Sequence, residues 1–105
     1  MPPQGRLGDK AAAPVDVHGC VGCPHSVQGP AVTGSNNVLV NNKPALRATD
    51  RGIHGQCCGP NTWVATLGSP TVLINYLPAH RQGDLTTHCG GVGQLIEGSE
   101  DVLVG

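Results

Sequence analysis

Two stretches of this chain repeat one another. Residues 34–50 read GSNNVLVNNKPALRATD and residues 68–84 read GSPTVLINYLPAHRQGD, with nine of seventeen positions identical. Each stretch begins at a Gly-Ser turn, runs through a short β-branched segment, turns again and returns at a proline. Turn residues placed around short apolar runs are typical of β-hairpins. The repeat therefore predicts short strands joined by tight turns, and no segment has sustained helical periodicity.

The same motif recurs at the two ends of the chain. Residues 98–105, GSEDVLVG, copy its first half, and Arg6-Leu-Gly-Asp9 resembles Arg81-Gln-Gly-Asp84. We divide the chain into units at 6–46, 47–80 and 81–105. Each unit opens R-x-x-D, passes through a Cys/His-rich loop and closes on G-S-x-x-V-x-V/I, but only the first two continue through the hairpin return. The expected fold is a single all-β domain over residues 1–105, with short β-hairpins in a pseudo-threefold arrangement of the three units that can match a homotrimer.

Composition points to a small core that needs an additional staple. Gly and Pro make up 25 of 105 residues, and Trp63 and Tyr76 are the only aromatic residues. A core this thin contributes about 3–5 kcal/mol. With 12% charged residues and a net charge of −1, the chain cannot neutralise a phosphate track, so we expect no nucleic-acid partner.

Neither a secretory signal nor a membrane span is expected. The N-terminal residues contain no apolar run of the secretory type, and no stretch approaches the roughly 20 apolar residues of a membrane helix. We therefore expect synthesis in a reducing cytoplasm, where clustered Cys and His favour metal binding over disulfides.

The Cys and His residues, His80 excepted, fall in three clusters that begin at His18, His54 and His88. Counted back from each Gly-Ser, His25, Cys58 and His88 stand nine or ten residues before it, and His54 and His88 each stand four residues after the Asp of their unit. These registers predict one metal site whose ligands are His25, His54, Cys58 and His88. Three imidazoles and one thiolate suit Zn²⁺, and four protein ligands make a closed, structural site. Structural zinc contributes roughly 10–16 kcal/mol in small domains.

The register leaves other ligand sets open. Adjacent residues can replace members of the predicted set, and the candidates are His18, Cys20, Cys23, Cys57 and Cys89. Cys20-x-x-Cys23 can also be a redox pair, although that motif belongs to a βαβ setting. His80, inside a hairpin strand, is predicted to be a packed or surface histidine.

An enzymatic role is the weaker alternative. A catalytic zinc needs an open coordination position and a nearby Glu as proton shuttle. Glu97 and Glu100 are the only Glu residues, both near the C-terminal end, and no His-x-Glu motif exists. We therefore expect no enzyme, and keep a small zinc hydrolase or a free-standing zinc or redox module as rival hypotheses.

Pro44-Ala-Leu-Arg47 and Pro78-Ala-His-Arg81, together with the R-x-x-D and G-S-x-x-V motifs, closely resemble the PAAR-repeat family over essentially the whole chain. The resemblance implies a sharp, conical β structure stapled by one zinc ion near its point through three His and one Cys. It implies a non-enzymatic tip that caps the trimeric valine-glycine-repeat spike of a type VI secretion system through the base of the cone.

Further expectations follow from that resemblance. Such a tip would aid puncture of the target membrane, which it contacts transiently, and would help deliver effectors. Effectors or adaptor chaperones would be additional partners, and the protein would pass from the cytoplasm into the target cell on firing. An equivalent tip of a phage tail, tailocin or extracellular injection particle is the alternative. The units leave no room for a toxin domain, so no effector extension is expected.

The hairpin residues are expected to form an apolar base, with some of them filling the interior instead. The candidates for both places are Val38, Val40, Val72, Ile74, Val102 and Val104.

Overall fold

The computed structural model describes residues 2–16, 25–54, 62–88 and 91–105, and this part of the chain is all-β. Six strands form the main sheet: β1 (Lys10–Asp16), β2 (His25–Pro30), β5 (Arg51–Ile53), β6 (Thr62–Ala65), β9 (Leu85–His88) and β10 (Val92–Leu95). Two further pairs form small hairpins: β3 (Leu39–Val40) with β4 (Lys43–Pro44), and β7 (Leu73–Ile74) with β8 (Leu77–Pro78). No helix that could cross a membrane occurs among these residues.

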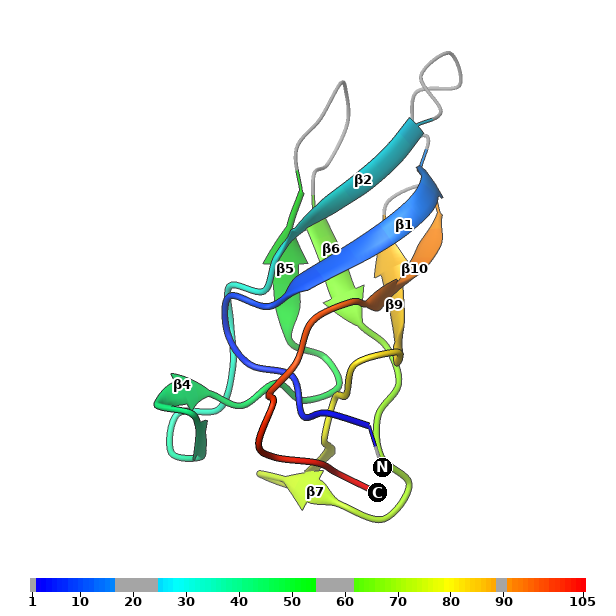
Figure 1. Cartoon of the computed structure of the whole chain (residues 1–105). Helices are drawn as coiled ribbons and strands as arrows, with labels where there is room; N and C mark the ends of the chain where they lie inside the picture. The colour runs from blue at the N-terminus through cyan, green and yellow to red at the C-terminus, as the bar shows by residue number, and fades with distance from the viewer. Residues whose placement is uncertain (1, 17–24, 55–61, 89–90) are drawn as a thin grey trace.

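The six-stranded sheet curls into a nearly closed barrel (Figure 1). Its strand order is β2–β1–β10–β9–β6–β5, and every neighbouring pair is antiparallel. The first and last strands approach one another through the bridge between Ala31 and Gly52. The molecule is elongated, with principal extents of 40 × 23 × 21 Å. In Figure 1 the small hairpins and both chain ends lie at one end of the molecule, which we call the base.

One tryptophan fills the interior of the barrel. Trp63 is 1% exposed and packs with small or aliphatic residues of the same cluster, Ala11, Ala31, Leu46, Ala65 and Leu95. Its Nε1 donates a hydrogen bond to the Gly29 carbonyl at 3.2 Å. A Cβ added to Gly52 would lie 2.1 Å from Cε2 of the Trp63 ring. The ring therefore requires glycine on the facing strand.

A second apolar cluster lies among the hairpins. It contains Val40, Ala45, Ile74, Ala79 and Val104, with Val38 and Val102 packed against it. The structure thus divides the six valine and isoleucine candidates, since Val40, Ile74 and Val104 point inward whereas Val72 is exposed. The strand residues that point outward beside them are leucines.

The two complete hairpins turn through residues in the left-handed region. Asn41 and Asn42 have φ of 54° and 65°, and Asn75 and Tyr76 have φ of 54° and 68°. Two consecutive positive φ values identify a two-residue type I′ turn, which matches the right-handed twist of paired strands. The two predicted hairpins are therefore confirmed.

The third unit also has a return segment, joined by an isolated β-bridge, contrary to the prediction that only the first two units continue through the return. Pro3 pairs with Leu103, as Pro44 pairs with Leu39 and Pro78 with Leu73. The Gln4 N–H donates to the Val102 carbonyl at 2.9 Å. The N-terminal segment therefore completes the last hairpin, which the sequence reading missed because the two halves lie at opposite ends of the chain.

Equivalent residues of the three units bond to one another in cyclic order. The Gly5 N–H donates to the His80 carbonyl, the His80 N–H to the Leu46 carbonyl, and the Leu46 N–H to the Gly5 carbonyl, at 2.9–3.0 Å. Each is the third residue of its Pro-x-x-Arg motif, and the N-terminal copy of that motif, Pro3-Gln-Gly-Arg6, departs most from the others. These three hydrogen bonds form a closed ring that joins the three units through backbone groups alone.

The R-x-x-D motifs make the same paired contact three times. The guanidinium groups of Arg6, Arg47 and Arg81 contact both carboxylate oxygens of Asp9, Asp50 and Asp84, at 2.8–3.0 Å. The hydrogen bond to Asp raises the pKa of each Arg above its ordinary value. Each arginine therefore pairs with the aspartate of its own unit.

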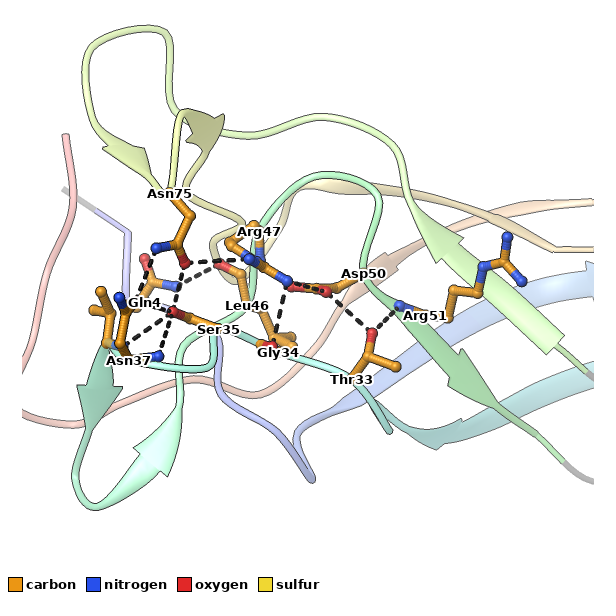
Figure 2. Close-up of polar contacts among 11 residues, drawn as sticks. Gln4, Thr33, Gly34, Ser35, Asn37, Leu46, Arg47, Asp50, Arg51 and Asn75 are labelled. Carbon is orange, nitrogen blue, oxygen red and sulfur yellow. Dashed lines mark hydrogen bonds and ion pairs between the residues drawn. The ribbon is translucent and has the colours of Figure 1, made fainter.

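The Gly-Ser positions form the predicted turns and also bridge neighbouring units. The Ser35 hydroxyl accepts the N–H groups of Asn37 and Val38, at 3.2 and 3.0 Å, and donates to the Asn75 side chain at 2.5 Å (Figure 2). Figure 2 also shows Asn75 contacting Arg47 of the middle unit. Ser99 repeats the bridge to Asn41, and Ser69 repeats it to the Gly105 carbonyl. These serines therefore fix how adjacent hairpins meet at the base.

Candidate functional site

Two of the four predicted metal ligands lie together in the described part of the chain. His54 follows β5 and His88 ends β9, and both strands run from the base toward the opposite end of the sheet (Figure 1). Both side chains are only 4% exposed. Their ring centroids lie 5.0 Å apart with the planes tilted by 31°. The structure thus brings together His54 and His88, the two predicted ligands that each stand four residues after the Asp of their unit.

Neighbouring side chains hold His88 in place. The Thr86 hydroxyl lies 2.9 Å from His88 Nε2, in a buried contact two residues away on the same face of β9. Trp63 pairs with His88 across the sheet. The centroid of its ring lies 6.3 Å from the centroid of the His88 imidazole. Because Thr86 occupies Nε2, a metal held by His88 would be bound through Nδ1. A hydrogen bond to the second ring nitrogen is the usual support of a metal-bound histidine.

The geometry of this pair fits a zinc site. Two imidazoles bonded to one Zn²⁺ at about 2.0–2.1 Å with tetrahedral angles have ring centroids about 5 Å apart. The observed 5.0 Å agrees, although two packed aromatic rings adopt a similar separation without a metal. No group of three or more Cys, His, Asp or Glu side chains converges within residues 2–16, 25–54, 62–88 and 91–105.

The other predicted ligands lie outside this description. His25 begins β2, but its side chain is not among the described ones, and Cys58 lies in the undescribed segment 55–61. The alternative ligands also lie outside the described residues: His18, Cys20, Cys23, Cys57 and Cys89. The choice among the sets consequently stays a prediction.

His80 lies apart from this pair and is fully buried. Its backbone belongs to the ring of hydrogen bonds with Gly5 and Leu46, and its Nδ1 lies 2.6 Å from the Leu67 carbonyl. Burial disfavours the charged imidazole and lowers the pKa of His80 below 6.5. The packed alternative of the sequence prediction is the one observed.

A second candidate site is the base. Leu39, Leu73 and Leu103 occupy the middle position of V-L-V, V-L-I and V-L-V, and are 60%, 59% and 50% exposed. Each pairs with the proline of its hairpin, so the three leucines have the same environment in the three units. Exposed apolar residues repeated in this way form a surface suited to a partner.

The sequence reading missed these leucines, although a signal was present. Alternation along a strand places Leu on the face opposite its two β-branched neighbours, and small side chains such as Ala45 and Ala79 already favour packing of Val40 and Ile74 inward.

No protein-family model and no curated protein matches this chain.

Proposed function

We propose that this protein is the zinc-stabilised, non-enzymatic tip of a contractile injection machine, seated by its base on a homotrimeric valine-glycine-repeat spike. The proposal combines the motif resemblance to the PAAR-repeat family with the arrangement of the two candidate sites. The type VI secretion system is the machine proposed here, with effector delivery and membrane puncture as the role.

The observation that carries the proposal is the triplicate base. Three leucines in equivalent hairpin positions are exposed at 50–60%, and equivalent backbone and serine contacts connect the three units in cyclic order. A pseudo-threefold surface of this kind gives each subunit of a homotrimer the same apolar contact. A monomeric partner would gain nothing from the repetition.

The opposite end supports the second half of the proposal. A tip that is driven through a membrane must resist deformation where strand pairing ends. His54 and His88 lie at that end, buried and at a separation that suits zinc. A bound zinc would cross-link β5 and β9 there, and Lewis-acid chemistry is not required of it.

The test of the docking is co-purification with the cognate trimeric spike, followed by native mass spectrometry. We expect one chain and one zinc per spike trimer. Leu39→Asp, Leu73→Asp and Leu103→Asp should each weaken the complex, because a carboxylate would be buried against an apolar surface. Val92→Asp is the matched control, since Val92 is 58% exposed but lies on β10, away from the base.

Equal weakening by all four substitutions, or a chain that never binds a trimeric spike, would refute the docking. The same geometry would serve a phage tail or tailocin, so spikes from each class of machine should be compared in this assay.

A further inference from the structure

Tyr76 occupies a backbone conformation that its side chain disfavours. It is the second residue of the turn between β7 and β8, with φ of 68°. Type I′ turns require positive φ at both central positions and strongly prefer Asn, Asp or Gly there. A bulky residue with positive φ is an outlier, and such outliers gather at functional sites.

The neighbouring hairpin supplies an internal comparison. The equivalent turn between β3 and β4 has Asn42 at the same position, with φ of 65°. The two turns have the same length and the same backbone, and Asn75 and Asn41 precede these residues with an identical φ of 54°. The fold therefore accepts Asn at this position and does not require Tyr.

Packing within the chain does not account for the tyrosine either. Tyr76 is 93% exposed, so almost no part of the ring is covered by the described residues. On the same hairpin, Leu73 is 59% exposed and Val72 is 37% exposed. The β3–β4 hairpin instead carries Asn42 and Lys43 beside its leucine. One hairpin of the base is thus distinctly more apolar and aromatic than its equivalent.

We propose that Tyr76 is the binding anchor of the base, inserting into an apolar pocket with a polar rim on one subunit of the trimeric spike. This inference rests on the proposed function and adds to it. The three leucines would contact all three subunits alike, whereas the tyrosine would contact one. Tyrosine suits this role because it brings a large contact area with few rotatable bonds, and it is enriched among the residues that dominate interface energies.

The chemistry of the partner pocket follows from the side chain. The ring requires an apolar slot, and the phenolic O–H, which stays in water in the free chain, requires an acceptor or water at the slot's rim. Because the subunits of the spike are identical, three such pockets would exist and one would be filled. The cap could then seat in three equivalent rotations, with one anchored subunit in each.

The experiment compares Tyr76→Asn with the wild-type chain in two measurements: the thermal midpoint of the free chain, and the affinity for the purified spike trimer. Asn copies the equivalent hairpin and suits the turn, so Tm should stay the same or rise. Affinity should fall about 30-fold, the size of an interface hot spot. Asn42→Gly, at the same turn position of the other hairpin, is the matched control and should leave affinity unchanged.

The outcomes separate the two proposals. If the wild-type chain binds the spike and Tyr76→Asn binds equally well, the anchor is refuted while the spike-tip function stands. If Tyr76→Asn lowers Tm together with affinity, Tyr76 has a structural role and the anchor is again refuted. If the wild-type chain binds no trimeric spike, both proposals fail. A photo-reactive benzoylphenylalanine at position 76 should cross-link to a spike subunit, and the same group at position 92 should not.

Discussion

At the scale of single residues, the three histidines whose side chains the structure describes, His54, His80 and His88, have two different environments. His54 and His88 lie as a close pair at the end away from the base, with Thr86 hydrogen-bonded to His88. His80 lies buried among backbone groups near the base. The first environment suits metal binding and the second suits a neutral imidazole, so substitutions at the two places should have different signatures.

Thr86→Val tests the support of the metal pair. Valine has nearly the same shape but no hydroxyl, so His88 would lose the partner of Nε2 while the packing is kept. Loss of such a supporting contact typically lowers metal affinity about 10- to 100-fold. Zinc competition against a chromophoric chelator measures it. Thr87→Val is the control, since Thr87 is exposed and bonds to Thr66 instead. Equal zinc affinity in both variants would show that Thr86 does not support the metal site.

The burial of His80 predicts that part of the unfolding free energy depends on pH. Burial lowers its pKa below 6.5 in the folded chain, so the unfolded chain binds the proton more readily. Stability from this group is therefore fully present above about pH 6.5 and is lost as the pH falls toward the folded pKa. His80→Leu, which copies Leu46, removes that part of the pH dependence.

Urea unfolding of both chains at about pH 7.5 and about pH 5 measures the effect. Between the two pH values, wild type should lose more unfolding free energy than His80→Leu. The same loss in both would show that the buried imidazole titrates normally.

At the scale of elements, the barrel needs glycine where a strand passes close to a large side chain. Gly52 on β5 faces Trp63 on β6, and its missing side chain leaves room for the indole. The sequence predicted strands and turns well because Gly-Ser, Pro and Asn positions act locally. It did not predict which strand face is covered, because that depends on residues of other units, such as Ala79 and Val104 in the cluster that contains Val40.

The candidate site was predictable to a similar extent. The repeat register selected His54 and His88, which are close because both follow their Asp by four residues on equivalent strands. The inward position of His80 and the pairing of Pro3 with Leu103 depend on contacts between distant segments. Local motifs carry no information about such contacts.

Gly52→Ala tests the packing of these two strands. The new methyl would lie 2.1–2.4 Å from three atoms of the Trp63 ring, which has neither space nor flexibility to yield. We expect a loss of about 1–3 kcal/mol or more, the usual cost of overpacking. Urea unfolding measures it. Ile53→Ala, at the adjacent, 47% exposed position, should change stability by about 0.5 kcal/mol or less. If both alanine substitutions cost the same, the indole can move aside and the packing argument fails.

At the scale of the whole molecule, the chain closes into a ring of three hairpins. Pro2 accepts a hydrogen bond from the Val104 N–H at 2.8 Å, so the two ends lie together at the base. In the repeat register Gly105 corresponds to Asn41 and Asn75, and Met1 corresponds to Asn42 and Tyr76. A direct link between Gly105 and residue 1 would therefore complete a third two-residue turn.

This register predicts a circular permutant that needs no linker. The permuted chain begins with Met in place of Asn42, continues from Lys43 to Gly105, then has Gly in place of Met1, and ends with residues 2–41. Its new Gly-Gly turn permits the positive φ of a type I′ turn. The new chain ends lie in the turn between β3 and β4, which is the equivalent turn of the first hairpin. We expect a folded chain with a circular dichroism spectrum and zinc content like those of the parent.

The control permutant is opened between Val64 and Ala65 instead, inside β6 and beside the buried Trp63. It should lose stability strongly, because the break interrupts the barrel and its core. If the turn permutant unfolds while the β6 permutant folds, the three hairpins are not interchangeable parts of one ring. The cyclic contacts among Gly5, Leu46 and His80 would then not be what holds the units together.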